Sequence, residues 1–224
     1  MKLSVIIPTC RRPAELLRCL QALRDQQRLP DEVLVALRED DSETLVALAT
    51  WDPGPLPLRI VSVGLVNASE ARNRCLDLAT GDVIVMTDDD TAPHHDFLAR
   101  IRTRFVAEPA LGGLGGPDWI GGIELPEAER ATRIGRVTWW GRQVGNHHRG
   151  CSAPQVVEWL KGANMSFRRE ALAGHRFGRG LRGGAAQFGE DLALSLQVHR
   201  AGWKLLYDPS VAVDHFPGAM VPGT

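Results

Sequence analysis

Apolar runs that alternate with helical patterns constrain the fold of residues 1–110 more than any other feature. Short, mostly apolar runs are typical of buried strands, and leucines recurring every three or four residues indicate amphipathic helices. The predicted strands are Leu3–Ile7, Glu32–Leu37, Leu58–Val63 and Asp82–Thr87. The predicted helices begin at Pro13, span Ser42–Thr50, run from Asn67 to a stop at Gly81, and span Asp96–Ala107. This alternation predicts an α/β fold, with a mostly parallel central sheet flanked by helices.

The second half of the chain is less regular. A glycine-rich stretch, Leu111–Gly122, predicts a strand or loop, residues 124–155 predict a long variable segment, and Trp159–Arg168 predicts a strand. After Gly189 we predict a helix through Ala201, followed by strands at Lys204–Tyr207 and Val211–Val213. Leucines at 192, 194 and 196 also fit strand alternation. Acids at the start of the segment, basic residues at its end and Gly202 after it favour the helix.

Composition excludes some classes of function. The 224 residues carry a net charge of −1, so nothing indicates a nucleic-acid partner. No apolar run approaches the length of a transmembrane segment, although peripheral membrane association stays open. The four cysteines lack the spacing of a zinc site or of a disulfide framework, which favours reduced thiols. We therefore expect a cytoplasmic protein, with the inner face of the membrane as an alternative location.

Three consecutive aspartates, Asp88, Asp89 and Asp90, follow the apolar run at Asp82–Thr87. The carboxyl end of a parallel strand is where open α/β sheets bind ligands. Three adjacent carboxylates repel one another unless a cation shares them, and hard oxygen ligands suit Mg²⁺ or Mn²⁺. The motif therefore predicts a site for a metal and a diphosphate. A solvated turn or a helix cap is the alternative interpretation.

Several motifs in order resemble the family 2 glycosyltransferases of the GT-A fold. They are the first strand with Thr9 and Arg11-Arg12, then Glu70-Ala71-Arg72-Asn73, Ala79-Thr80-Gly81-Asp82, the three aspartates, Lys161–Arg169 and Gly189-Glu190-Asp191. The resemblance covers nearly the whole chain. It implies transfer of a sugar from a nucleoside-diphosphate sugar to a hydroxyl-bearing acceptor, with inversion at the anomeric carbon and help from Mn²⁺ or Mg²⁺.

The resemblance also implies roles on the donor side of the site. Asp90 would bind the metal, Asp88 would contact the nucleoside or ribose, and Asp89 would be a second metal or donor contact. His215 would lie near the metal, although a lone histidine is more often structural. The other expected contacts to the nucleotide-sugar are Pro8, Thr9, Arg11 and Arg72.

Asp191 is the expected general base, since a carboxylate facing the anomeric carbon can accept the proton of the acceptor hydroxyl. Glu190 would bind acceptor hydroxyls. The alternative is that both acids only favour a helix N-terminus. The further expected acceptor contacts are Trp119, Lys161 and Asn164, with Trp139-Trp140 and His147-His148 as weaker candidates.

One stretch departs from the family pattern. Relatives commonly carry Asp-Asp-Gly-Ser after the second strand, whereas this chain reads Arg38-Glu39-Asp40-Asp41-Ser42. The shifted acids put uridine specificity in doubt, and Asp40 is the expected base contact.

We expect one glycosyltransferase domain over residues 1–224, with a nucleotide-sugar half at 1–110 and an acceptor and catalytic-base half at 111–224. A sugar-1-phosphate nucleotidyltransferase is a competing hypothesis, although the loop after the first strand has no glycine to grip phosphate. A catalytically inactive nucleotide-sugar-binding protein is another. The sequence identifies neither donor nor acceptor, and it does not settle the oligomeric state.

Overall fold

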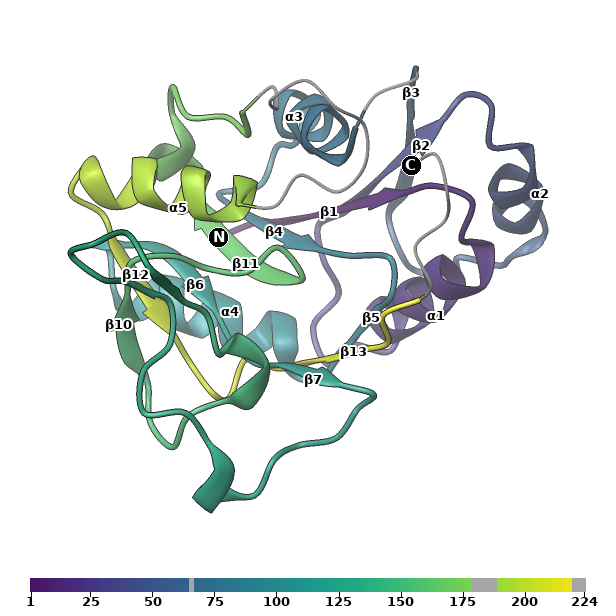
Figure 1. Cartoon of the computed structure of the whole chain (residues 1–224). Helices are drawn as coiled ribbons and strands as arrows, with labels where there is room; N and C mark the ends of the chain where they lie inside the picture. The colour runs from purple at the N-terminus through teal and green to yellow at the C-terminus, as the bar shows by residue number, and fades with distance from the viewer. Residues whose placement is uncertain (65–66, 179–188, 219–224) are drawn as a thin grey trace.

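The computed structural model describes residues 1–64, 67–178 and 189–218, and its centre is an eight-stranded sheet (Figure 1). The strands are β1 (Leu3–Thr9), β2 (Glu32–Arg38), β3 (Leu58–Val63), β4 (Val83–Thr87), β6 (Leu111–Gly115), β10 (Gln155–Val157), β11 (Asn164–Arg168) and β12 (Lys204–Tyr207). Their order is β10-β12-β6-β11-β4-β1-β2-β3. Both halves of the sequence therefore contribute strands to one sheet. The division into domains stays a prediction.

The first four strands run parallel, as the sequence predicts. β11 enters the sheet between β4 and β6 and is antiparallel to both. This antiparallel strand joins the second half of the chain directly to the strand that precedes the three aspartates.

In the described part of the chain, five α-helices cover the sheet: α1 (Pro13–Arg24), α2 (Ser42–Thr50), α3 (Ala68–Leu78), α4 (Phe97–Ala107) and α5 (Glu190–Arg200). The apolar side chains of α3 and α5 share one core cluster, and those of α1, α2 and α4 belong to another. Figure 1 shows α3 and α5 on the upper face of the sheet, and α1 and α4 below it. The sheet is therefore buried on both faces, which explains why its strands read as almost continuous apolar runs.

A second sheet has three strands: β5 (Thr91–Pro93), β7 (Asp118–Ile120) and β13 (Val213–His215). β13 lies in the middle, antiparallel to β5 and parallel to β7. Because β5 begins directly after Asp90, this small sheet brings residues from near position 118 and position 215 to the end of β4.

The long segment predicted over residues 124–155 contains a small hairpin, β8 (Arg136–Val137) with β9 (Gln143–Val144), and precedes β10. Short 3₁₀ turns flank the hairpin at η1 (Glu127–Glu129) and η2 (His147–Arg149), and a third, η3 (Arg169–Leu172), follows β11.

Three boundary predictions were wrong. The final strand is Val213–His215 rather than Val211–Val213, because the Asp208 side chain holds a turn through the backbone N–H of Ser210. The predicted strand at Trp159–Arg168 begins only at Asn164, after a turn centred on Gly162. The helix predicted to reach Gly81 ends at Leu78, although Asn67 does cap its start through the Glu70 N–H.

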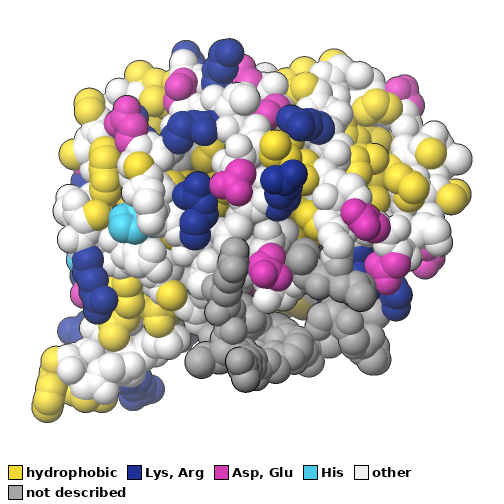
Figure 2. Space-filling model, turned by 90° about the horizontal axis from the view of Figure 1, so that it is seen from above, with side chains coloured by type: hydrophobic (Ala, Val, Ile, Leu, Met, Phe, Trp, Pro, Cys, Tyr) yellow, Lys and Arg dark blue, Asp and Glu magenta, His cyan; other side chains and the backbone are white. Residues whose placement is uncertain are grey.

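The face seen in Figure 2 carries interspersed acidic and basic side chains, in keeping with the net charge of −1. Of the helices in the described part of the chain, none combines the length and the apolar character that crossing a bilayer requires.

Candidate active site

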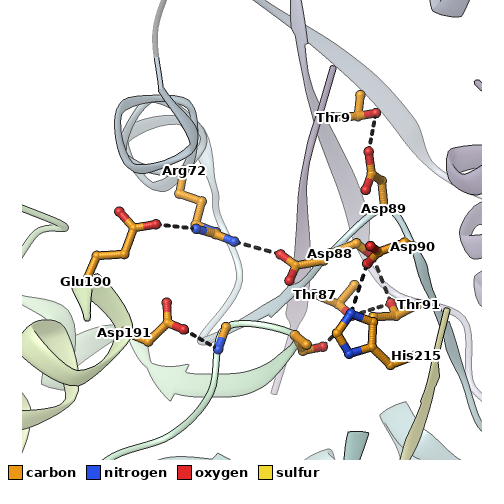
Figure 3. A network of polar contacts seen from close by, with 12 residues as sticks. Thr9, Arg72, Thr87, Asp88, Asp89, Asp90, Thr91, Glu190, Asp191 and His215 are labelled. Atoms are coloured by element: carbon orange, nitrogen blue, oxygen red, sulfur yellow. Dashed lines mark hydrogen bonds and ion pairs between the residues drawn. The ribbon is translucent and has the colours of Figure 1, made fainter. Parts of the chain in front are cut away.

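The three aspartates lie beside the carboxyl end of β1, because β4 and β1 are adjacent and parallel (Figure 3). Thr9, the last residue of β1, donates its hydroxyl to Oδ2 of Asp89 at 2.7 Å. Arg12 bridges two of the aspartates, with Nη1 at 3.3 Å from Oδ1 of Asp89 and 3.0 Å from Oδ2 of Asp90. A hydroxyl and a guanidinium thus balance part of the negative charge of the cluster.

Arg72 joins the two halves of the site (Figure 3). Its guanidinium lies 2.7 Å from Oδ1 of Asp88 through Nη2 and 3.0 Å from Oε1 of Glu190 through Nη1. The arginine is 6% exposed, so these ion pairs are shielded from water on the arginine side. One buried cation therefore fixes the distance between the three aspartates and the start of α5.

Asp191 begins α5 next to Glu190 and is held by one backbone group. The N–H of Gly162 donates to Oδ2 of Asp191 at 2.7 Å. A Cβ on residue 162 would lie 2.8 Å from that same oxygen, so only glycine lets the backbone approach the carboxylate this closely. The turn before β11 thus positions the predicted base.

His215 connects Asp90 to Asp118. Its Nδ1 lies 3.0 Å from Oδ2 of Asp118, and its Nε2 lies 3.3 Å from Oδ1 of Asp90. Lys161 forms a second ion pair with the same oxygen of Asp118. The N–H of Phe216 also donates to the carbonyl of Asp90 at 2.9 Å. The small sheet therefore holds His215 next to Asp90.

Burial and charge shift the pKa values of these acids in different directions. Burial raises the pKa of Asp89 to about 7 despite the Thr9 hydrogen bond. Burial likewise raises the pKa of Glu190 and of Asp191, in both cases against the attraction of Arg72. For Asp90 the effect of burial is exceeded by the hydrogen bond and charge of His215, so its pKa is lowered. Neighbouring carboxylates thus differ in the pH at which they ionise.

The pKa of His215 is raised to about 9, because the hydrogen bonds and charges of Asp118 and Asp90 outweigh burial, which lowers it. The pKa of Asp118 is lowered by His215 and Lys161 although burial raises it. Without a bound cation, His215 therefore carries a positive charge beside Asp90 at neutral pH.

Comparison with known proteins identifies the family. The model of glycosyl transferase family 2 matches residues 4–174. The chain belongs to glycosyl transferase family 2. The matched region includes the three aspartates, Arg72 and Lys161.

Two relatives support this family. The succinoglycan biosynthesis protein ExoM of Rhizobium meliloti is 29% identical over 95% of the chain and 66% of the relative. The glucosyl-dolichyl phosphate glucuronosyltransferase of Haloferax volcanii is 24% identical over 66% of the chain and 47% of the relative. The chain thus spans between about half and two thirds of the length of these relatives.

Solved structures confirm the GT-A fold. The mannosyltransferase PcManGT from Pyrobaculum calidifontis, in complex with GDP-Man and Mn²⁺, superposes with a TM-score of 0.66 at 21% identity, over 96% of this chain and 56% of that one. TarS 1–349 from S. aureus superposes with a TM-score of 0.64 at 18% identity, over 94% of this chain and 61% of that one.

The residues around Asp90 of this family 2 chain fit a divalent cation. Oδ1 of Asp90 lies 3.3 Å from a ring nitrogen of His215, and Asp90 is 6% exposed. A carboxylate oxygen and an imidazole nitrogen are both ligands that Mn²⁺ accepts. Among residues 1–64, 67–178 and 189–218, no three His, Cys, Asp or Glu side chains are grouped to hold a metal alone. The remaining ligands would come from a substrate diphosphate, as is usual for Mg²⁺.

Other predicted residues lie in less expected surroundings. Trp119 is 3% exposed and Asn164 is 1% exposed, with the Asn164 amide donating to the carbonyls of Pro117 and Val211. Asp40 is exposed and ion-paired to Arg38 and Arg11. Their predicted roles stay predictions, but burial leaves Trp119 and Asn164 little surface for a ligand. Pro8 lies within β1, paired with Ala36.

Three residues of the site were not predicted as site residues. Asp41, not Asp40, is the buried acid after β2. It caps α2 through the Thr44 N–H and accepts the Arg11 N–H at 2.5 Å. Arg12 and Asp118 are the others. Arg12 was visible as half of an arginine pair, whereas nothing local in the sequence distinguishes Asp118.

Proposed function

We propose that this family 2 glycosyltransferase chain is a metal-dependent, inverting enzyme that transfers a sugar from a nucleoside-diphosphate sugar to an acceptor hydroxyl. The Arg72 bridge carries the proposal. Arg72 pairs with Asp88, our proposed donor-side carboxylate, and with Glu190, our proposed acceptor-side carboxylate, and Asp191 is next in sequence to Glu190.

Asp191 is the proposed general base. The acceptor oxygen bonds to the anomeric carbon while the bond from that carbon to the diphosphate oxygen breaks, and the electron pair leaves with the nucleoside diphosphate. The hydroxyl proton passes to Asp191. Attack opposite the leaving group inverts the anomeric centre. Burial raises the pKa of Asp191, and a stronger base accepts a proton more readily near neutral pH.

The leaving diphosphate needs positive charge as it departs. A divalent cation held by Asp90 and His215 would act as a Lewis acid and stabilise the negative charge that develops on the leaving diphosphate. Arg12 and Lys161 supply further positive charge on the two sides of the same cluster. The solved relative that binds GDP-Man with Mn²⁺ supports this pairing of nucleotide-sugar and metal.

The proposed nucleotide side of the site consists of Asp88, Asp89, Thr9 and the loop at Arg11. The proposed acceptor side consists of Glu190 and Lys161. Within the part of the chain that the structure describes, Oε2 of Glu190 is buried and has no hydrogen-bond partner. We propose that an acceptor hydroxyl donates to that oxygen, because a buried acceptor left unpaired costs free energy.

The test is a thermal-shift panel with UDP, GDP, TDP and CDP, each with and without Mn²⁺. A ligand that binds only the folded state raises its stability by about 2.7 kcal/mol at one hundred times its Kd. We expect one nucleotide to stabilise the protein in the presence of Mn²⁺, and Mn²⁺ alone to do little, since the cation lacks ligands. If no nucleotide raises the midpoint with metal, the proposal is wrong.

A further inference from the structure

The β8–β9 hairpin ends in two of the most exposed large apolar side chains of the described residues. Trp139 is 92% exposed and Trp140 is 61% exposed, and their rings meet edge to face with centroids 5.2 Å apart. A projection at the lower left of Figure 2, on the side where Figure 1 places β10 and β12, ends in hydrophobic side chains. Large exposed aromatic groups on a protruding element mark an interaction surface.

The hairpin is built to hold these rings outward. Thr138–Gly141 forms its turn, closed by the Gly141 N–H on the Thr138 carbonyl at 2.8 Å, with Gly141 at φ +83°. The Thr138 N–H donates to the Arg142 carbonyl at 2.9 Å, and the Arg142 N–H donates to the Thr138 hydroxyl at 2.9 Å. Trp139 and Trp140 thus occupy the two central positions of a hydrogen-bonded turn. Their exposure follows from a defined backbone geometry.

The charged residues within the segment that contains the hairpin are all basic. From residue 130 to residue 157 the sequence has five arginines and no aspartate or glutamate, in a chain whose net charge is −1. Arg133, Arg136 and Arg142 are exposed, and within the described part of the chain none of them forms an ion pair. Arg136 and Arg142 share one face of the hairpin, because their cross-strand partners are Val144 and Thr138.

We propose that the β8–β9 hairpin docks this protein on an anionic phospholipid surface. Tryptophan prefers the boundary between headgroups and acyl chains, where its ring is buried and its N–H stays hydrated. Unpaired arginines next to it complement anionic headgroups. The charge pattern favours this occupant over an uncharged sugar acceptor, which offers the arginines no anionic group, and a second copy of the chain is an outcome that the test below distinguishes.

Docking there would also orient the active site. Trp159 packs against the hairpin near Gly145, and the Glu158 carboxylate accepts the Val137 N–H at 2.5 Å. Three residues after Trp159, Gly162 holds Asp191. The hairpin and the proposed catalytic base are thus connected through one short stretch of backbone. The docking proposal does not rest on the proposed function, and its test does not measure activity.

The experiment is flotation of the protein with vesicles of phosphatidylcholine alone or with phosphatidylglycerol. We expect binding only to the mixed vesicles, weakened by salt because the charges are screened. Trp139→Ala with Trp140→Ala should weaken binding at least about tenfold, and Arg136→Gln with Arg142→Gln by about fivefold per arginine. The matched control is Leu45→Ala with Val46→Ala, which removes exposed apolar side chains of α2 and should leave binding unchanged.

A measurement on the unaltered protein guards against variants that fail to fold. Its tryptophan emission should shift to shorter wavelength when phosphatidylglycerol vesicles are added and stay constant with phosphatidylcholine alone. Equal binding by the tryptophan variant and the unaltered protein would overturn the proposal. So would the absence of any binding to the mixed vesicles, or a concentration-dependent dimer that the tryptophan variant abolishes.

Discussion

At the scale of single residues, the site differs from an ordinary surface cluster in how its acids are paired. Asp88 and Asp90 each face a cation, Arg72 or Arg12, whereas Asp89 is buried at 5% exposure with a hydroxyl as its shortest partner. Asp191 has one backbone donor. Because each acid has its own surroundings, substitutions of neighbouring acids should have different effects.

Asp191→Asn should lower the rate of sugar transfer by several powers of ten, since it removes the base, while nucleotide binding is retained. Asparagine keeps an oxygen for the Gly162 N–H, so the fold should be unaffected. Single-turnover kinetics measures this loss. The matched control is Glu43→Gln, an acid in the first turn of α2, which tests whether a helix-terminal acid matters by itself. Near-normal transfer by Asp191→Asn would exclude Asp191 as the base.

Asp89 should make the metal-free protein less stable as pH rises. Its folded pKa of about 7 lies above its ordinary value, so the folded state binds more protons than the unfolded state between about pH 4 and pH 7. Stability is then lost as pH rises through this range, on the order of 4 kcal/mol by pH 8 for this one group. Asp89→Asn should remove that slope. Urea unfolding at pH 5 and pH 8, with a chelator present, measures it, and parallel curves for the two proteins would contradict the expectation.

At the scale of elements, sequence periodicity predicted the first half of the fold well. β1, β2 and β4 are buried almost throughout between the helices on the two faces of the sheet, and their apolar runs were therefore unambiguous, whereas β3, at the edge of the sheet, is partly exposed. In the second half, the Gly162 N–H donates to the distant Asp191 side chain, and the Ser210 N–H donates to the nearby Asp208 side chain. These hydrogen bonds hold the two turns, and the spacing of apolar residues in the sequence does not predict them. Motifs singled out Arg72 and Glu190 as candidate site residues, but not that these two residues, 118 positions apart, form an ion pair.

Gly162→Ala should damage catalysis more than stability. The new Cβ would lie 2.8 to 3.1 Å from atoms of the Asp191 carboxyl group, which is the end of a side chain and can move aside. The fold then survives, but the base leaves its position, so kcat should fall at least about tenfold because small misplacements are costly. Gly64→Ala is the control, since no atom of the described residues lies within 4 Å of a Cβ there. If the free energy of unfolding falls by as much as the activation free energy for kcat rises, Gly162 has a structural role only.

At the scale of the whole molecule, Arg72 links the residue that follows β4 to the start of α5. Arg72→Gln leaves Asp88 and Glu190 without their cation in a largely buried setting, and breaking such pairs costs about 3 kcal/mol or more. Denaturant unfolding measures this loss. Arg72→Gln combined with Glu190→Gln should recover part of it, because an unpaired charge is then removed. If the double variant is less stable than the single one, the coupling is absent.

The position of β13 between β5 and β7 has a consequence for synthesis on the ribosome. Domains fold as their chains emerge, and Asp88 to Asp90 leave the ribosome long before Val213–His215. Until then β5 and β7 have no strand between them, and Asp90 has no histidine beside it. A nascent chain therefore displays the three aspartates without a complete site. Completion of the proposed site therefore waits until β13 has been synthesised, so nascent chains that lack β13 should bind the proposed donor and metal poorly.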